Sequence, residues 1–546
     1  MNLLWAPVAA LGVYYVFLFL ERAFRRRLLL TQTCVFDVDS LGHRFPAQKI
    51  KGTAVICGGS IAGLTAARVC HDHFEDVVII EPEAWLNSAD AKRPDSWNQE
   101  NKRSRVMQYE SFHALLTIGY RTMMKLFPDF TGECKSSAIR TGPNDTHVHL
   151  WGNNPKKPYN EYGGTLPKTI YTGRIGLETL LRRLVLGGKY NNIRQITGTA
   201  TGVSRNTSNP RFIEQVSIRT AEGAIVDIPA ALVIDCTGST TAGLKWLQRE
   251  GYGFSDTYSK IQRPLDGLKI AYDQKLRYST LQFCVPPELG RKLPGLPVPY
   301  DECGVIYCLI ADPEKENRGV YSQRIDGDFM QICFSISGGD DVELPTTLEE
   351  ARTWTRSLIT EVPIPEGWFA MLDMLEEVQE SMACSQVRFG PSTWIQYEKG
   401  VNLPSNWIAA GDSVMKVNPL HGQGCSKAMY GAICLNQLLQ TVQSSIPEDF
   451  SQKYFRMHAA KIEPLWYILL ILPNLNYAFA STVPVLGETL SEGSLLRWYM
   501  KKFMILSFTD AQAGSAIWHF RVLLAPSIDL LQPRLLFKVL WSLIKP

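Results

Sequence analysis

The sequence predicts an α/β protein in which a parallel sheet flanked by helices is interleaved with an antiparallel sheet. Three observations lead to this prediction. Residues 53–83 have the pattern of strand, glycine turn, helix and strand, and residues 407–428 repeat a strand, a glycine-bearing loop and a helix. Between them, residues 264–395 hold short strand candidates separated by Gly, Pro and Asp. Since 546 residues exceed one ordinary core, we expect two interleaved domains with appended segments.

The first glycine turn follows an apolar run, Ala54 to Cys57, of the length of a buried strand. A turn, an Ala-rich helix, a second strand and a terminal acid then follow in the order of a dinucleotide-binding βαβ unit. Gly58 permits the tight reversal, Gly63 lets helix and strand pack closely, and Glu81 can accept hydrogen bonds from a ribose. Ser60 replaces the usual middle glycine, so we expect slightly less backbone clearance at this turn.

The second glycine-bearing segment begins where a strand from Trp407 delivers Gly411 and Asp412. A loop then leads to Gly422 and Gly424 at the start of a new helix, roughly 350 residues beyond the first turn. Glycines at a helix start allow a flat or anionic ligand to approach closely. The carboxylate of Asp412 beside them can accept hydrogen bonds from the hydroxyls of a polyol.

Five residues between these motifs are further candidates for contacts with the same ligand. Arg105 and Gln108 lie in a basic loop that leads into an amphipathic helix, and Arg174 stands just ahead of a Leu-rich helix. A third buried strand ends at Asp235 and turns at Gly238. We expect its carboxyl end beside the first strand, where open α/β sheets bind ligands. The basic loop could equally be a solvated helix start, and the arginine a simple helix flank.

Taken together, the two motifs resemble the single-component flavoprotein monooxygenases of the para-hydroxybenzoate hydroxylase class, over about residues 52 to 440. The resemblance implies a Rossmann-like FAD-binding domain of the GR2 type. Its first motif would hold the ADP half of FAD, and its second the ribityl chain and the isoalloxazine. Within the class, the turn GGSIAG, the Val-x-Gln loop followed by His113, and Leu-Phe-Pro resemble the epoxidases of polyether biosynthesis and squalene epoxidase.

The resemblance also assigns residues to the cofactor site. Asp235-Cys-Thr-Gly238 continues into Ser239, Thr240 and Thr241, where the family commonly has Arg and Ser, which weakens any assignment of nicotinamide contacts. His421 lies inside the second loop and could orient water or substrate, or simply bond to the backbone. The residues expected to bind the cofactor are Gly58, Ser60, Gly63, Glu81, Arg105, Gln108, Arg174, Asp235, Gly238, Gly411, Asp412, Pro419, Gly422 and Gly424.

The implied reaction is an NAD(P)H-using monooxygenation, in which a flavin C4a-hydroperoxide inserts one oxygen atom from O₂ into a lipophilic terpenoid or polyketide alkene. The flavin carries this chemistry, so no catalytic triad or carboxylate pair is required. One alternative is an FAD-dependent reductase of the geranylgeranyl reductase type, and another is a non-catalytic flavin- or lipid-binding membrane protein. Flavin halogenation is disfavoured because the sequence has no W-x-W-x-x-P segment.

Composition excludes several other functions. A formal net charge of +3 is too small to indicate nucleic acid binding, and the 12 cysteines show neither the CxxC spacing of a metal site nor a disulfide framework. The scattered cysteines favour a reducing compartment that faces the cytosol.

Both ends of the chain are apolar. Leu3 to Leu20 is uncharged and is followed by a cluster of arginines, which predicts a single-pass anchor in residues 1–28, with the catalytic body on the cytosolic face of the endoplasmic reticulum. Residues 446–546 predict apolar helices, which could lie at a bilayer surface or cap the protein's own core. We expect an FAD domain in two parts, residues 50–263 and 396–445, around a substrate-covering antiparallel sheet in residues 264–395.

Overall fold

A parallel five-stranded sheet forms the centre of the computed structural model, which describes residues 5–339, 342–471 and 477–542. Its strand order is β18-β10-β1-β2-β6, and every pairing is parallel. The alignment of Cys57 with Asp235 confirms that the third predicted strand ends beside the first. The strands are β1 (Ile50–Cys57), β2 (Phe74–Glu81), β6 (Ile193–Thr197), β10 (Leu232–Asp235) and β18 (Trp407–Ala409).

Two helices that follow the glycine motifs cover this sheet. α2 (Ile61–His73) and α10 (Gly424–Leu439) pack against each other, although they are far apart in the sequence. Most residues of both helices are buried, because they sit between the sheet and the rest of the core. The packing of α2 on α10 brings the two predicted motifs into one region of the fold.

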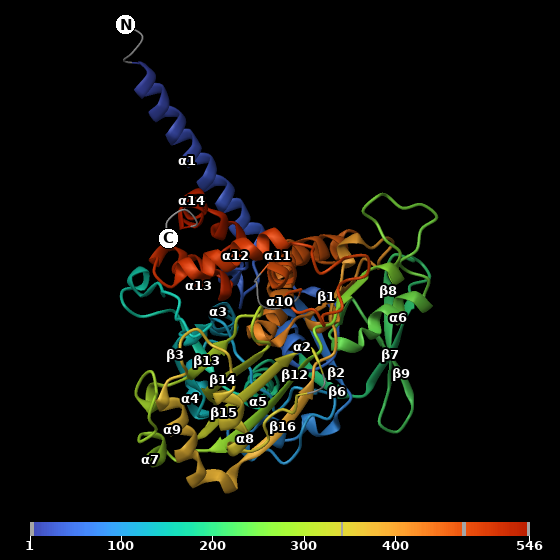
Figure 1. Cartoon of the computed structure of the whole chain (residues 1–546). Helices are drawn as coiled ribbons and strands as arrows, with labels where there is room; N and C mark the ends of the chain where they lie inside the picture. The colour runs from blue at the N-terminus through green and yellow to red at the C-terminus, as the bar shows by residue number, and fades with distance from the viewer. Residues whose placement is uncertain (1–4, 340–341, 472–476, 543–546) are drawn as a thin grey trace.

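An antiparallel sheet forms the second layer, as predicted for the middle of the chain (Figure 1). Its six strands have the order β16-β12-β15-β14-β13-β4, in which β4 comes from outside the predicted range and pairs in parallel with β13. The predicted strand Val305–Ile310 has the bounds of β13. The strands are β4 (Val148–Leu150), β12 (Leu276–Cys284), β13, β14 (Arg318–Arg324), β15 (Phe329–Ser337) and β16 (Ala383–Arg388).

Smaller sheets and helices complete the body. The polar segment before β10 forms a three-stranded antiparallel meander, in agreement with the prediction of a meander or hairpin there. The meander strands are β7 (Thr199–Arg205), β8 (Ile213–Arg219) and β9 (Ile225–Pro229). The other small sheets are formed by β3 (Arg140–Pro143) with β5 (Lys168–Tyr171), and by β11 (Lys269–Tyr272) with β17 (Ser392–Ile395) and β19 (Met415–Lys416). The remaining helices before residue 400 are α3 (Thr117–Leu126), α4 (Phe130–Ser136), α5 (Arg174–Leu186), α6 (Ala242–Arg249), α7 (Pro287–Gly290), α8 (Leu348–Arg356) and α9 (Glu366–Met374).

The apolar C-terminal region is helical, as predicted, and part of it packs on the antiparallel sheet. Phe503 and Phe520 belong to the same buried cluster as Tyr278 and Cys308 of that sheet. The four helices therefore contribute to the protein's own core. They are α11 (Phe450–Ile471), α12 (Ser494–Ser507), α13 (Ala511–Arg521) and α14 (Pro533–Ser542).

The predicted membrane anchor and the membrane localisation derived from it are wrong. Of the helices in the described ranges, none combines the length and apolar character needed to cross a bilayer. α1 (Trp5–Gln32) is uncharged only from Trp5 to Leu20 and then continues as one helix through the charged cluster. About 20 apolar residues are needed for a span. Met1 to Leu4, which began the predicted anchor, lie outside the described residues.

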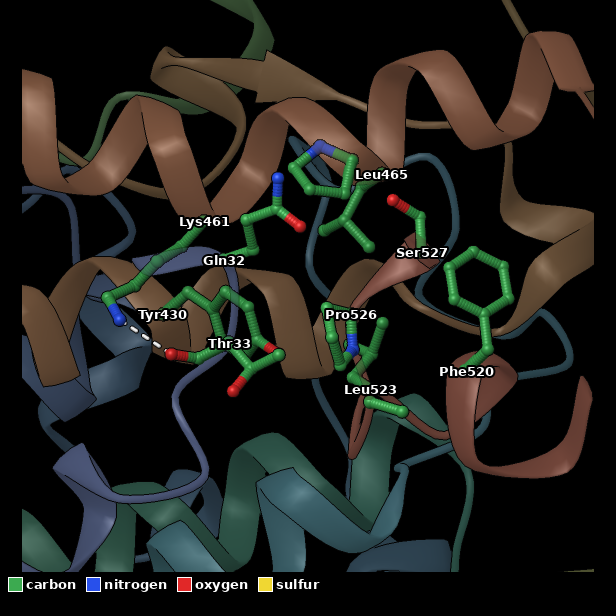
Figure 2. A pocket seen from close by; sticks show the side chains of 11 residues that line it. Gln32, Thr33, Tyr430, Lys461, Leu465, Phe520, Leu523, Pro526 and Ser527 are labelled. Carbon is green, nitrogen blue, oxygen red and sulfur yellow. Dashed lines mark hydrogen bonds between the residues drawn. The ribbon is translucent and has the colours of Figure 1, made fainter. Parts of the chain in front are cut away.

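The second half of α1 is instead attached to the body, while its first half extends away from it (Figure 1). Arg25 forms a bidentate pair with Asp529, at 2.8 and 2.6 Å. Where the helix ends, the Lys461 ammonium of α11 donates to the Thr33 carbonyl at 2.6 Å, beside a cavity of about 20 Å³ (Figure 2). Lys461 also pairs with Asp37 at 2.6 Å, so the charges near this end serve intramolecular contacts.

Candidate functional site

The two glycine motifs meet directly in the structure. Gly411 has a φ of +68°, and a Cβ placed on it would lie 2.7 Å from the Cβ of Ala62, in the first turn of α2. A side chain at position 411 would therefore force the two segments apart. Ser413, two residues later, accepts a hydrogen bond from the amide of Gly238 at 2.9 Å and donates to the carboxylate of Asp235 at 3.1 Å. The carboxyl ends of β1, β10 and β18 are thus joined.

The first turn is packed so closely that its glycines are required. A Cβ on Gly63 would overlap the carbonyl oxygen of Gly58, and a Cβ on Gly58 would overlap the carbonyl oxygen of Cys236. Gly58 also has a φ of +122°, which residues with a side chain rarely adopt. These contacts let α2 begin directly above β1, so that the amide groups of its first turn face the edge where ligands of such sheets bind.

The hydroxyl of Ser60 links this turn to α5. It donates to Glu178 at 2.9 Å and accepts from the Arg174 guanidinium at 2.7 Å. Arg174 also pairs with Glu178 at 3.1 Å, and Arg182, one turn further along α5, pairs with the same carboxylate at 3.4 Å. Ser60, which replaces the expected glycine, is therefore the residue through which Arg174 of α5 contacts the turn.

A buried charge cluster surrounds the end of β2. Glu81 is 1% exposed and accepts the amide of Gly59 at 2.9 Å. Arg103 contacts Glu81 at 3.3 Å and also pairs with Glu83 and Glu178. Burial alone raises the pKa of Glu178, but the charges of Arg103, Arg174 and Arg182 outweigh it and bring the value to about 2. Glu178 is therefore ionised at neutral pH.

The predicted basic loop places its two candidate residues in different surroundings. Arg105 is exposed, whereas the neighbouring Arg103 is buried in the cluster around Glu81. Gln108 donates to the hydroxyl of Tyr278 in β12 at 2.7 Å, so this loop is tied to the antiparallel sheet. The loop therefore bridges the two layers of the protein at the edge of the site.

Asp235 is directed into the protein. Its carboxylate is fully buried and accepts hydrogen bonds from the amide of Thr237 at 2.9 Å and the amide of Gly243 at 3.1 Å. Burial raises the pKa of Asp235, and these hydrogen bonds oppose the rise. By contrast, a Cβ on Gly238 would meet no atom within 4 Å, so the backbone at Gly238 borders open space.

Asp412 is accessible to a ligand while held in place by a buried lysine. Its side chain is 47% exposed and lies 2.6 Å from the ammonium of Lys427, which is itself 1% exposed. The same ammonium also donates to the carbonyl of Met415. Lys427 fixes one carboxylate oxygen of Asp412 and leaves the group facing outward.

The second loop presents backbone to open space just before α10. Pro419 to His421 form one helical turn, capped by Asn418, which accepts the amide of Leu420 at 3.0 Å. Gly422 follows with a φ of +65°, and a Cβ on Gly424 would meet no atom within 4 Å. A flat group could therefore approach this segment closely.

His421 points into a buried region. Its Nε2 atom has no hydrogen-bond partner among the described residues, and its pKa is lowered to about 3 by burial and by the charge of Arg521. The imidazole is therefore neutral at neutral pH. His421 also lines a cavity of about 70 Å³ that extends from the second loop to α13.

Several residues of this site were not singled out from the sequence. Glu178 and Arg182 follow Arg174 at intervals of four, a spacing that places them on one face of a helix and could have revealed the cluster. Ser413 and Lys427 flank the second motif, but nothing in their spacing indicates what they contact. Arg521 lies about 100 residues beyond the motifs, and only the tertiary fold brings it there.

The residues present fit an extended dinucleotide. A carboxylate ends β2, backbone is exposed at Gly238 and Gly424, and Asp412 faces outward. These features lie at the carboxyl ends of β2, β10 and β18, along one edge of the parallel sheet, which is where a mononucleotide half and a second, polyol-bearing half would be held.

Comparison with known proteins establishes the fold. No protein-family model matches the chain. Protein Rv3254 of Mycobacterium tuberculosis is 23% identical over 488 residues, which cover 84% of this chain and 90% of that protein. The flavin-dependent brominase Bmp2 has a TM-score of 0.53 at 12% identity, with 91% of this chain and 98% of that chain covered.

Two further solved structures agree. The flavin-dependent halogenase CmlS has a TM-score of 0.51 at 14% identity, covering 91% of this chain and 78% of its own. A flavoprotein/dehydrogenase from Cytophaga hutchinsonii has a TM-score of 0.50 at 11% identity, covering 91% and 99%. The mixed α/β fold predicted from the sequence is therefore shared with these three solved structures.

Proposed function

We propose that this protein is an FAD-dependent, NAD(P)H-using monooxygenase, similar to the para-hydroxybenzoate hydroxylase class, that inserts one oxygen atom into a lipophilic alkene by epoxidation or hydroxylation. The observation that carries the proposal is the contact between the two glycine motifs at Gly411 and Ala62. The contact brings both motifs to one edge of the parallel sheet, where a single elongated ligand could span them. The fold shared with flavin-dependent oxidoreductases supports the same conclusion.

Each part of the site has a role in this proposal. The amides at the start of α2 would face the pyrophosphate, and Glu81 the ribose of the adenosine half. Asp412, oriented by Lys427, would accept hydrogen bonds from the ribityl hydroxyls. Gly422 and Gly424 would line the flavin ring, with Arg174 close to the phosphates through its contact with Ser60.

When bound, the flavin supplies hydride acceptance and oxygen activation. The overall balance is one substrate, one O₂, one NAD(P)H and one proton giving the oxygenated product, NAD(P)⁺ and one water. The chain itself must orient the substrate and exclude bulk water. α13, the edge strand β4 and the segments beside it would do this by enclosing the cavity beside His421, whose neutral imidazole could position a substrate atom without adding a charge.

The first experiment asks whether the protein carries the cofactor. Full-length protein is purified, its absorption spectrum is recorded, and the ligand released by denaturation is identified by mass spectrometry. We expect the spectrum of oxidised flavin and the mass of FAD. A colourless protein that stays colourless after incubation with FAD would refute the proposal.

The second experiment identifies the reaction. Holoenzyme, NADH or NADPH and a panel of lipophilic alkenes are incubated under isotopically heavy O₂, and O₂ uptake is measured with product masses. A product that gains one heavy oxygen supports monooxygenation. Loss of a double bond without O₂ uptake would instead assign a reductase, and bromine in the product when bromide is present would assign halogenation.

A further inference from the structure

The cavity beside His421 has an unusual distribution of charge. It lies between the second glycine loop, the segment before α3, the segments on both sides of β4, and α13. Leu116, Val148, Ile517 and Trp518 supply an apolar wall. Its charged lining consists only of cations within the described residues, namely Lys156, Lys157 and Arg521.

Arg521 is the cation of this lining that the protein leaves uncompensated. Its side chain is half-buried, and its guanidinium forms no hydrogen bond or ion pair with any described residue. Burial lowers the pKa of Arg521, and the groups that oppose this effect are the thiol of Cys308 and the phenol of Tyr321, not a carboxylate. A guanidinium normally gains several hydrogen bonds when it is withdrawn from water.

The position of Arg521 at the end of α13 does not account for it. A basic side chain there could satisfy the last carbonyl groups of its own helix. Here those carbonyls are used by backbone amides: Val522 donates to Trp518 at 3.0 Å, and Leu524 donates to His519 at 2.8 Å. The guanidinium is left to face the cavity.

The two lysines differ from Arg521 in a way that isolates its role. Lys157 is paired with Asp145 at 2.8 Å, so its charge is already balanced. Lys156 is exposed, where solvent screens its charge. Arg521 alone in this lining is both withdrawn from solvent and without a counter-ion.

Arg521 is also fixed relative to the candidate flavin loop. The side-chain amide of Gln423, between the two loop glycines, donates to the carbonyl of Arg521 at 3.3 Å. His421, whose pKa is lowered by burial and by the charge of Arg521, lies on the same cavity wall. A ligand group bound by Arg521 would therefore stand beside the second loop.

From this arrangement we propose that the substrate is an amphipathic acid, whose carboxylate or other anionic group is bound by the guanidinium of Arg521 while its apolar part lies against Ile517 and Trp518. This inference rests on the proposed function, since it names the substrate class of the same site. The substrate would then be an alkene that carries an anionic group, and not a fully neutral alkene.

The test compares two small probes of the same shape, isobutyrate and the neutral isobutyramide, by calorimetric titration of the full-length protein. Because a charge-assisted hydrogen bond is stronger than a neutral one, we expect the carboxylate to bind about tenfold more tightly or better. Arg521→Gln should abolish this preference, and Arg521→Lys should restore part of it. Arg534→Gln removes an exposed arginine of α14 and should leave the preference intact.

Two results would overturn the inference: equal affinity for the two probes in the unaltered protein, or a preference for the carboxylate that persists in Arg521→Gln. Since Arg521 has no partner to lose, this variant should unfold at no lower temperature than the parent protein, which separates binding from misfolding. Probe binding is measured without turnover. If the purified protein bound no flavin but still preferred the carboxylate through Arg521, the proposed function would be refuted. The binding of an anionic group by Arg521 would stand.

Discussion

The guanidinium of Arg174 donates to the hydroxyl of Ser60 at 2.7 Å, across the junction between α5 and the first glycine turn. A glycine at position 60 would supply no acceptor for it. The departure from the usual glycine pattern is thus coupled to an arginine more than 100 residues away, and both meet at Glu178. The turn keeps its tight geometry through Gly58 and Gly63, which cannot be replaced in the same way.

Ser60→Ala should destabilise the protein by about 1 kcal/mol, because it removes one donor and one acceptor from the partly buried contact with Arg174 and Glu178. Urea unfolding at neutral pH measures the change. Ser136→Ala, at an exposed serine at the end of α4, is the matched control and should change stability little. Equal stability of the parent protein and Ser60→Ala would show that the link to Arg174 contributes nothing.

Acid should destabilise the protein through Glu178. Its pKa in the folded protein is about 2, against an ordinary value of 4.5, so its stabilising contribution is complete above about pH 4.5 and is lost as the pH falls toward 2. The full contribution is about 3 kcal/mol. Unfolding free energies measured from pH 6 to pH 3 should therefore decline, by less in Glu178→Gln than in the parent protein. If the exposed Glu377→Gln flattened the profile equally, the cluster would not be the cause.

Gly63→Ala should prevent correct folding of the first motif, because the new Cβ would overlap the carbonyl oxygen of Gly58. Gly132→Ala provides the control: it lies in α4, where a Cβ meets no atom within 4 Å, and alanine favours helix there by about 0.5–1 kcal/mol. Soluble yield and thermal unfolding should fall for the first variant and hold or rise for the second. A well-folded Gly63→Ala protein would contradict the packing described for α2 on β1.

Gly424→Ala distinguishes a ligand site from a packing site. Its Cβ would enter open space, so the protein should fold as stably as its parent. If the flavin ring occupies that space, the variant should nevertheless lose flavin, which the absorption spectrum and fluorescence titration with FAD would measure. A variant that binds FAD with unchanged affinity would place the ring elsewhere.

Asp412→Asn should weaken FAD binding by about tenfold to a hundredfold, the scale of one charge-assisted hydrogen bond lost at the ribityl chain. The variant also leaves Lys427 with a neutral partner, so thermal unfolding is recorded beside the titration. Asp449→Asn removes an aspartate from another aspartate–lysine pair, with Lys453 at the surface, and should leave FAD affinity unchanged. If the two variants bound FAD with equal affinity, Asp412 would not be a contact of the cofactor.

Periodicity and glycine spacing were sufficient to predict the nucleotide-type sheet and much of the second one, because buried parallel strands and tight turns leave local patterns. The strand at Val305–Ile310 and the pairing of β10 with β1 are examples. The partners of an ion pair leave no such pattern in the sequence. Thus the loop pattern indicates a basic cluster that contains Arg103 and Arg105, and only the tertiary fold shows that Arg103 turns inward to Glu81 while Arg105 is exposed.

At the apolar N-terminus, a clear local pattern led to a wrong prediction. Local hydropathy made residues 3–20 look like a span, but α1 continues past them and its Arg25 is committed to Asp529, some 500 residues away. The chain alone determined where strands, turns and glycine loops occur, since short-range sterics and hydrophobic burial fix them. The fold alone decided which charges are neutralised at Glu178 and Asp529 and which one, Arg521, is left facing a cavity, because electrostatic pairing depends on distance in space and not on separation along the chain.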